Sequence, residues 1–83
     1  MAEEIKADKI LDAKGLLCPM PVMKTNQVIK EIQIGQILEV VATDPASKSD
    51  ITAWCKTTGN ELLKIIEEKG NPTVYRFYIR KTR

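Results

Sequence analysis

Two prolines one residue apart, Pro19 and Pro21, follow Cys18 directly and restrict the backbone more here than at any other point of the chain. Proline holds its φ angle at about −65° and has no backbone N–H, so it fits the first turn of a helix and breaks a helix interior. The stretch after Pro21 places one set of side chains at helical spacing. These side chains are Val22, Thr25, Ile29 and Ile32. The pattern predicts a helix that runs to about Ile32, with Met20 as one candidate for its N-cap and Cys18 at or just before its start.

The position of Cys18 makes it the candidate nucleophile of the chain. The thiolate is the reactive form of cysteine, and a helix N-terminus lowers the pKa of a thiol from roughly 8.5 to between about 3.5 and 7.5. The two prolines remove N–H groups that would otherwise bind the sulfur, so we expect a moderately activated, accessible thiol. A Cys-x-x-Cys redox pair is excluded, because Pro21 occupies the position three residues after Cys18. The alternative is a buried cysteine that only fills space, which is the usual situation of a free cysteine.

Three further residues near Cys18 are candidates for supporting roles. Gly15 lies in the predicted turn before the cysteine, and Asp12 ends the strand before that turn. Aspartate side chains accept hydrogen bonds from backbone N–H groups in turns, whereas a carboxylate beside the sulfur would oppose thiolate formation. We therefore interpret Asp12 as structural. Lys24 is the nearest cation downstream and would stabilise a negatively charged sulfur within a few ångströms, although a solvated helix lysine is the simpler interpretation.

Composition limits the chemistry that this chain can perform. The 83 residues carry a net charge of +2, and we expect one domain over residues 1–83, with residues 1–7 frayed. The sequence has no histidine, which excludes a Cys-His catalytic pair and the commonest nitrogen ligand of zinc. We expect neither a metal nor an organic cofactor. No apolar run approaches the roughly 20 residues of a membrane span, and two cysteines without a secretory signal predict a reduced, cytoplasmic protein.

Hydrophobic patterning predicts two strands and a second helix. Residues 9–12 form a short predicted strand, and residues 36–43, rich in β-branched side chains, form another. Asp44-Pro45 is a helix-start signal, with the aspartate as N-cap and the proline as first helical residue. The helix that follows would bury one face, made of Ile51, Trp54, Cys55 and Thr58. We interpret Trp54 and Cys55 as core residues rather than as a binding platform and a functional thiol.

Residues 61–69 give conflicting signals. Their composition of good helix formers favours a helix, yet Gly59-Asn60 precedes them and Gly70-Asn71-Pro72 follows, and both sequences are typical of turns. Residues 73–80 alternate as a strand does, with Tyr75, Phe77 and Ile79 on one face. A strand of this kind needs an antiparallel partner, and residues 61–69 are the nearest candidate. We therefore predict a strand over residues 61–69.

The segment around Cys18 resembles a known family signature. The spacing Asp12-x-x-Gly15-x-x-Cys18-Pro19-x-Pro21-Val22 is similar to that of the TusA/SirA family of small sulfur-carrier proteins, which carry sulfur as a persulfide on the cysteine of a Cys-Pro-x-Pro motif. The resemblance extends from about Lys9 through Asp44-Pro45-Ala46, Trp54-Cys55, Gly59-Asn60-Glu61-Leu62 and Tyr75-Arg76-Phe77-Tyr78-Ile79-Arg80-Lys81. Leu17 and Met20 stand where charged residues are frequent in the family, and Asn60 where histidine is common. These departures concern the choice of partner rather than the sulfur chemistry.

The predicted element order is β-α-β-α-β-β. Two helices on one face of a four-stranded mixed sheet give an α/β (α+β) two-layer sandwich, and the resemblance implies the same fold, including a strand over residues 61–69. The opposite, more solvated face of the sheet would carry Val74, Arg76, Tyr78 and Arg80. The C-terminal basic residues Arg76, Arg80, Lys81 and Arg83 have no acid among them in the sequence. We favour a protein-docking or solubilising role for this cluster.

The leading functional hypothesis is a sulfur carrier. The resemblance implies that Cys18 takes sulfane sulfur from a donor protein, such as a cysteine desulfurase or a rhodanese-like protein, and passes it to an acceptor protein. Such a chain acts with partners rather than as a stand-alone enzyme. The pathways compatible with the family are tRNA thiolation, molybdenum-cofactor maturation and sulfur oxidation. The alternatives are a regulatory or RNA-binding module that uses the basic C-terminal strand, and a mono-thiol redox protein; we do not expect nucleic acid as a direct partner.

Overall fold

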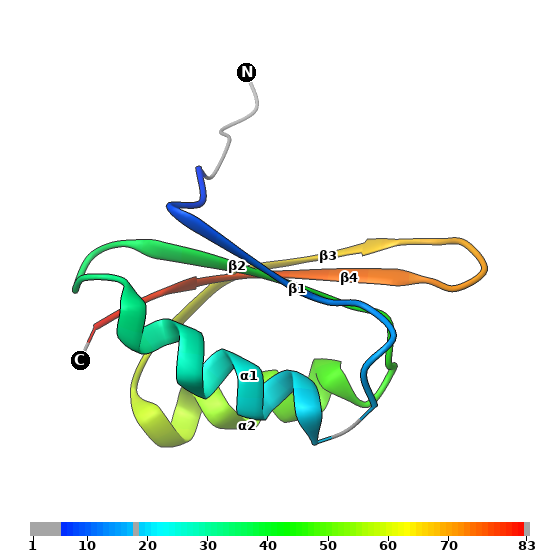
Figure 1. The fold of residues 1–83 in the computed structure, drawn as a ribbon, viewed down its shortest axis with the longest axis horizontal. Helices are drawn as coiled ribbons and strands as arrows, with labels where there is room; N and C mark the ends of the chain where they lie inside the picture. The colour runs from blue at the N-terminus through cyan, green and yellow to red at the C-terminus, as the bar shows by residue number, and fades with distance from the viewer. Residues whose placement is uncertain (1–5, 18, 83) are drawn as a thin grey trace.

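The structure, a computed structural model, describes residues 6–17 and 19–82 and follows the predicted order of elements (Figure 1). The elements in chain order are β1 (Lys9–Ala13), α1 (Met20–Val28), a 3-10 turn (Ile29–Glu31), β2 (Ile37–Ala42), α2 (Ser47–Thr58), β3 (Glu61–Glu68) and β4 (Val74–Arg80). The four strands form one sheet in the order β1-β2-β4-β3. Strands β1 and β2 are parallel, and the other two neighbouring pairs are antiparallel, so the sheet is mixed.

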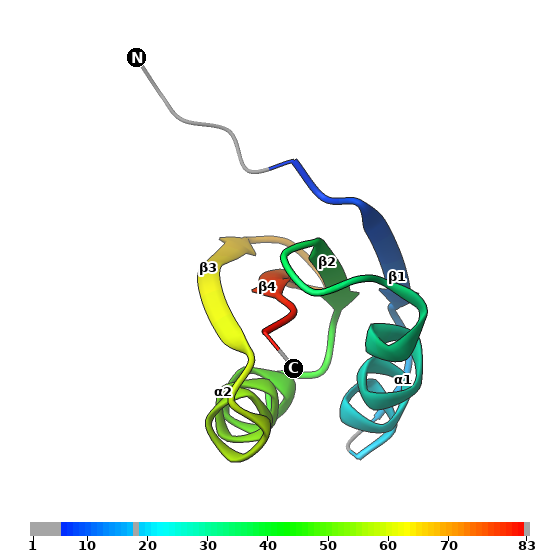
Figure 2. The same ribbon diagram turned by 90° about the vertical axis from the view of Figure 1, so that its left-hand side faces the viewer.

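Both helices cover the same face of the sheet, as the end-on view in Figure 2 shows. The α/β two-layer sandwich predicted from the sequence is confirmed. The core lies between the layers and combines the inward side chains of β2 and β4 with those of the helices. Fully buried members include Leu38, Val40, Ile51, Phe77 and Ile79. Burying apolar side chains of this size stabilises the fold by about 1.5–3 kcal/mol each relative to exposure.

The strand predicted over residues 61–69 is present as β3. It pairs antiparallel with β4, so that Leu62 is opposite Ile79 and Ile65 is opposite Phe77, and a bulge interrupts the register between Leu62 and Lys64. Leu62 and Ile65 pack against the core. Cross-strand burial of these side chains outweighs the helix propensity of the segment, which amounts to only a few tenths of a kcal/mol per residue (about 0 to 0.7).

Both helices differ at their ends from the sequence prediction. The N-cap of the first helix is Pro19 rather than Met20, and its α-helical part ends at Val28, with the 3-10 turn completing the predicted length. The second helix begins at Ser47, not at Pro45. Asp44 does not cap it: Asp44 Oδ1 accepts a hydrogen bond from the N–H of Ala46 (3.1 Å), which forms a turn before the helix. An aspartate that stabilises such a turn accepts the same kind of local hydrogen bond as an N-cap. The Asp44-Pro45 sequence therefore marks the turn before the helix and not the first residues of the helix.

The opposite face of the sheet is more solvated than the helix-covered face, as predicted, and its arginines are paired with acids. Glu39 is buried, and its Oε2 lies 2.9 Å from Nη1 of Arg76. The Nε of Arg76 lies 3.2 Å from Oε1 of Glu68. Arg80 forms an ion pair with Glu61. Although the sequence around these two arginines holds no acid, the fold supplies acidic partners from the neighbouring strands β2 and β3. Arg83 lies outside the described residues.

The pairing predicts unequal effects for the two arginines. Arg76→Ala should lower the free energy of unfolding by roughly 1–3 kcal/mol, because it leaves the buried carboxylate of Glu39 without its charged donor. Arg80→Ala is the matched control, since its partner Glu61 is exposed, and should cost only about 0.2–1 kcal/mol. Urea unfolding of both variants measures the difference. Equal losses would contradict the importance of the Glu39 contact.

Candidate functional site

The candidate nucleophile Cys18 lies outside the described residues, but the segments on both sides of it are described. The loop that precedes it, residues 14–17, connects the carboxyl end of β1 to the start of α1. Gly15 has a φ angle of +82°, a left-handed conformation that other residues adopt only with strain. Leu16 packs against the core, whereas Leu17, the next residue, is exposed. The loop is thus anchored on one side and presents the other side to solvent.

Hydrogen bonds fix the shape of this loop. The N–H of Lys14 donates to Oδ1 of Asp12 (3.0 Å), and the N–H of Leu16 donates to the carbonyl of Ala13 (3.2 Å). The N–H of Gly15 donates to the hydroxyl of Thr43, at the end of β2 (3.0 Å). The carboxylate of Asp12 is therefore used in the turn, which is the kind of contact expected of a structural aspartate. Its supporting role at the candidate site stays a prediction.

The two prolines set the geometry of the first turn of α1. Pro19 is the N-cap residue, and its carbonyl accepts a hydrogen bond from the N–H of Met23 (3.1 Å). Pro21 is buried, and its carbonyl accepts a hydrogen bond from the hydroxyl of Thr25 (2.7 Å). The N–H of Met20 is bound to the carbonyl of Leu17 (2.8 Å). The start of the helix thus has a rigid backbone in which several donors are absent or already used.

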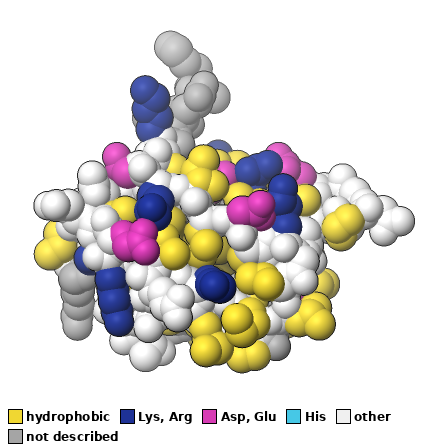
Figure 3. All heavy atoms as spheres, in the orientation of Figure 1, with side chains coloured by type: hydrophobic (Ala, Val, Ile, Leu, Met, Phe, Trp, Pro, Cys, Tyr) yellow, Lys and Arg dark blue, Asp and Glu magenta, His cyan; other side chains and the backbone are white. Residues whose placement is uncertain are grey.

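Exposed apolar side chains surround the position of Cys18 in the sequence. Leu17 is 72% exposed, Met20 38% and Met23 49%. We call these three residues the apolar patch. Figure 3 shows hydrophobic side chains gathered over the start of α1 and the loop that leads into it. Lys24, the predicted supporting cation, is also exposed on α1, and its role stays a prediction.

A shallow groove adjoins this region between α1 and α2. Two hollows of about 330 and 360 Å³ share Val22 and Trp54, and Pro19 lines the first of them. Trp54 packs against the core, as predicted, but it is only half-buried, and its indole Nε1 donates to Oδ1 of Asn26 on α1 (3.3 Å). The interpretation of Trp54 as core rather than platform is therefore incomplete. Sequence reasoning missed its place in the groove, because the spacing along α2 does not show which part of a large ring remains uncovered.

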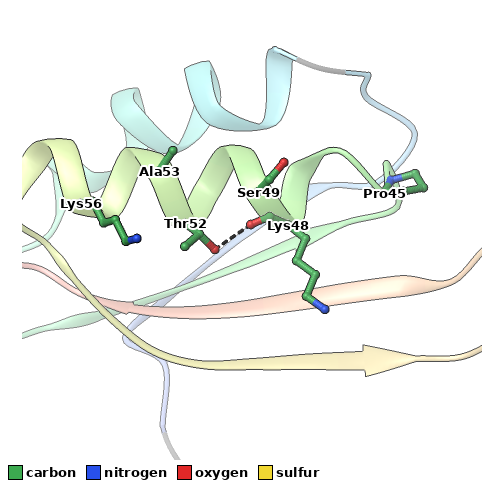
Figure 4. Close-up of a pocket in the computed structure, with 6 residues that line it drawn as sticks. All are labelled: Pro45, Lys48, Ser49, Thr52, Ala53 and Lys56. Atoms are coloured by element: carbon green, nitrogen blue, oxygen red, sulfur yellow. Dashed lines mark hydrogen bonds between the residues drawn. The ribbon is translucent and has the colours of Figure 1, made fainter.

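Another hollow lies along α2 and shares Ala53 with the groove (Figure 4). Three of the polar side chains that line it, Lys48, Ser49 and Thr52, are engaged within the chain. The Nζ of Lys48 is 2.5 Å from Oε2 of Glu67, and this contact raises the pKa of Lys48 and lowers the pKa of Glu67. The hydroxyl of Thr52 donates to the carbonyl of Lys48 (2.7 Å), and that of Ser49 donates to the carbonyl of Ala46 (3.2 Å). We therefore place the candidate site at the apolar patch and the α1–α2 groove.

The second cysteine, Cys55, is buried in the core, as predicted. Burial raises the pKa of its thiol from 9.0 to about 11, because a thiolate would be poorly solvated there. A thiol of this kind is neutral at physiological pH and has little nucleophilic character. This environment favours a structural role for Cys55.

Cys55→Ala should cost about 1 kcal/mol of stability, as small core truncations do. It should also change how stability depends on pH. Below pH 9 the thiol is protonated in both states, whereas between pH 9 and about 11 the unfolded chain loses the proton and the folded chain keeps it. The free energy of unfolding of the parent protein should therefore fall across this window by an amount on the order of 2 kcal/mol, and the Cys55→Ala protein should lack this component. Urea unfolding at both ends of the window tests this pH dependence. Native-state alkylation of Cys55 as fast as that of Cys18 would contradict the burial of Cys55.

Two further observations concern the described residues alone. Within residues 6–17 and 19–82, no group of three or more acidic, cysteine or histidine side chains is arranged to hold a metal ion. Among the helices of the same residues, none is long and apolar enough to cross a membrane.

Comparisons with known proteins agree with the resemblance seen in the sequence. The profile of the family described as Sulfurtransferase TusA matches residues 9–81. Putative sulfur carrier protein YrkI of Bacillus subtilis is 48% identical over 77 residues, which are 93% of this chain and 99% of that protein. Sulfur carrier protein TusA of Allochromatium vinosum is 43% identical over 75 residues, which are 90% of this chain and 95% of that protein.

A solved structure agrees with the fold. The crystal structure of a SirA-like protein from Desulfitobacterium hafniense superimposes with a TM-score of 0.71, covering 88% of this chain and 97% of that chain. At 20% sequence identity this likeness supports the fold alone. The profile match and the two close relatives carry the assignment, and together they show that this chain belongs to the Sulfurtransferase TusA family.

Proposed function

We propose that this chain is a sulfur carrier in which Cys18 holds sulfane sulfur as a persulfide between a donor protein and an acceptor protein. The observation that carries the proposal is the Cys18-Pro19-Met20-Pro21 sequence, which follows an anchored loop in the chain and includes the N-cap of α1, within the region that matches the family. The names of the relatives, which describe sulfur carriers, support it. Reduced thiols persist in the cytoplasm, where we expect the relay to operate.

The chemistry of the relay is two consecutive displacements at sulfur. In the first, the Cys18 thiolate attacks the terminal sulfur of a donor persulfide, so that a new S–S bond forms at Cys18 while the donor S–S bond breaks and its electron pair leaves with the donor thiolate. In the second, a nucleophile of the acceptor attacks the terminal sulfur on Cys18, and the Cys18 thiolate leaves. No external oxidant or reductant is needed, because each step exchanges one S–S bond for another bond to sulfur.

The surroundings of Cys18 favour protein partners over a small molecule. The apolar patch is exposed, and the adjoining groove is shallow rather than enclosed. Burial of exposed methionine and leucine side chains is a common source of affinity between proteins, and methionine adapts to partners of different shape. These features suit a carrier that contacts first a donor and then an acceptor with the same surface.

The test is sulfur loading followed by intact mass measurement. The reduced protein, incubated with a cysteine desulfurase and cysteine, should gain the mass of one sulfur atom, and dithiothreitol should remove it. Omission of cysteine is the control. A glutathione adduct at Cys18 with no persulfide formed under any donor would favour the mono-thiol redox alternative instead. We do not propose the RNA-binding alternative, because Arg76 and Arg80 contact carboxylates on neighbouring strands.

A further inference from the structure

Thr43 connects two loops that lie at the same end of the parallel strands β1 and β2. It follows the last residue of β2, and its half-buried side chain reaches across to the loop before Cys18. Its Oγ1 accepts a hydrogen bond from the N–H of Gly15 at 3.0 Å, over a separation of 28 residues. Nothing in the local sequence pattern marks Thr43 as a site residue, and the contact becomes visible only in the folded chain.

The bond to Thr43 differs in kind from the other hydrogen bonds of the loop. The contacts Lys14–Asp12 and Leu16–Ala13 are local, so they shape the turn without fixing where the turn lies. The Gly15–Thr43 bond ties the turn to the end of β2, and it does so at a residue whose left-handed φ angle of +82° reverses the chain direction. Three residues after Gly15 the chain reaches Cys18.

Thr43 also adjoins the turn that begins the second helix. Asp44, the next residue, accepts the N–H of Ala46 on its side chain (3.1 Å) and the N–H of Ser47 on its carbonyl (2.9 Å), and α2 starts at Ser47. Helix α2 carries Trp54, which lines the groove next to Pro19. The hydroxyl of Thr43 therefore connects the loop before Cys18 to the element that forms the far wall of the groove.

We propose that Thr43 is a positioning residue for Cys18, whose hydroxyl holds the loop before the cysteine in register with the α1–α2 groove. The inference rests on the proposed function, since it concerns the placement of the sulfur during transfer. Displacement of a reacting group by about 1 Å can cost up to about 100-fold in rate, so the loss of one such contact can have a large kinetic effect with little effect on folding. Because Gly15 is exposed, water can replace the lost acceptor and the variant should remain folded.

The test compares Thr43→Val, which keeps the shape of the side chain and removes its acceptor, with Thr43→Ser, which keeps the hydroxyl. Thr73→Val is the matched control, because the Thr73 hydroxyl also bonds to a backbone group of a turn, the carbonyl of Gly70 (3.4 Å), in the β3–β4 hairpin. One measurement is the single-turnover rate of sulfur transfer at saturating donor persulfide. The second is the rate of disulfide exchange between Cys18 and a small aromatic disulfide, which needs no partner protein.

Thr43→Val should slow transfer at least about tenfold at saturating donor and slow the small-molecule exchange about threefold, while Thr43→Ser and Thr73→Val stay within about twofold of the parent. Transfer by Thr43→Val at the parent rate, or an equal loss in Thr43→Ser, would overturn the inference and leave the proposed function standing. If the parent protein takes up no sulfur from any donor, the proposed function fails. In that case the rate of disulfide exchange with the small aromatic disulfide is the remaining test of the positioning role. Equal exchange rates for Thr43→Val and the parent would overturn that role.

Discussion

The Cys18→Ser protein is expected to gain no sulfur from any persulfide donor. A serine hydroxyl is a far weaker nucleophile than a thiolate at neutral pH and cannot form the S–S bond that defines the loaded state. The loss should therefore be complete rather than partial, and it should appear in the intact mass after incubation with a cysteine desulfurase and cysteine. It is the largest effect that we expect from any single substitution in this chain.

Cys55→Ser provides the matched control for this experiment. It makes the same chemical change at the other cysteine, which is buried and whose thiol pKa is raised to about 11. The Cys55→Ser protein should lose some stability but should load to one sulfur per chain. If Cys18→Ser still loads, Cys18 is not the carrier residue. If Cys55→Ser does not load although it is folded, Cys18 alone is not sufficient for loading.

The second large effect is expected from the apolar patch. Changing Met20 and Met23 together to serine should slow sulfur uptake from a protein donor by about 10- to 100-fold, mainly through a higher KM. Burial of a methionine side chain contributes at most about 1.5–3 kcal/mol, and the loss of part of this at two positions accounts for a change of that size. Loading from a small-molecule persulfide should be almost unchanged, because it does not require the docking surface. Parallel measurements with a desulfurase and with glutathione persulfide separate the two cases.

Ile10 and Ile34 are suitable control positions for the patch experiment. They are 62% and 69% exposed, more than Met20 (38%) and Met23 (49%), but Ile10 belongs to β1 and Ile34 to the turn before β2. Serine at both positions removes at least as much exposed apolar surface and should leave KM for the protein donor within about twofold of the parent. An equal rise in KM for both double variants would mean that general surface hydrophobicity, and not the patch, determines docking.

Much of the fold could be predicted from the sequence, because it depends on local signals. The glycine and proline turns on both sides of residues 61–69 predict a strand there despite the helix propensity of the segment. The alternation of residues 73–80 predicts an antiparallel neighbour, which the structure supplies in β3. The displaced start of α2 shows the limit of such signals. The same aspartate side chain can bind an N–H two residues later either in a free turn or at a helix start, and the sequence does not distinguish the two.

The parts that could not be predicted depend on contacts between residues distant in the chain. Arg76 contacts Glu39 because β4 lies beside β2, and the hydrophobic pattern of neither strand predicts that strand order. Thr43 meets Gly15, and Trp54 meets Asn26, each over 28 residues. Threonine and asparagine are ordinary residues in loops and on helix surfaces, so only the packing of the helices and loops shows which of them support the candidate site.

The bulge between Leu62 and Lys64 affects how the border of the sheet can meet another chain. Strands at the border of a sheet can recruit a foreign strand and begin an irreversible aggregate. Here one border strand, β1, has only five residues, and the other, β3, is interrupted by the bulge and carries charged side chains along its length. Both borders are poor templates for a foreign strand. Pairing between the backbone of this sheet and that of another chain is therefore disfavoured at both borders, and contacts with other proteins stay reversible.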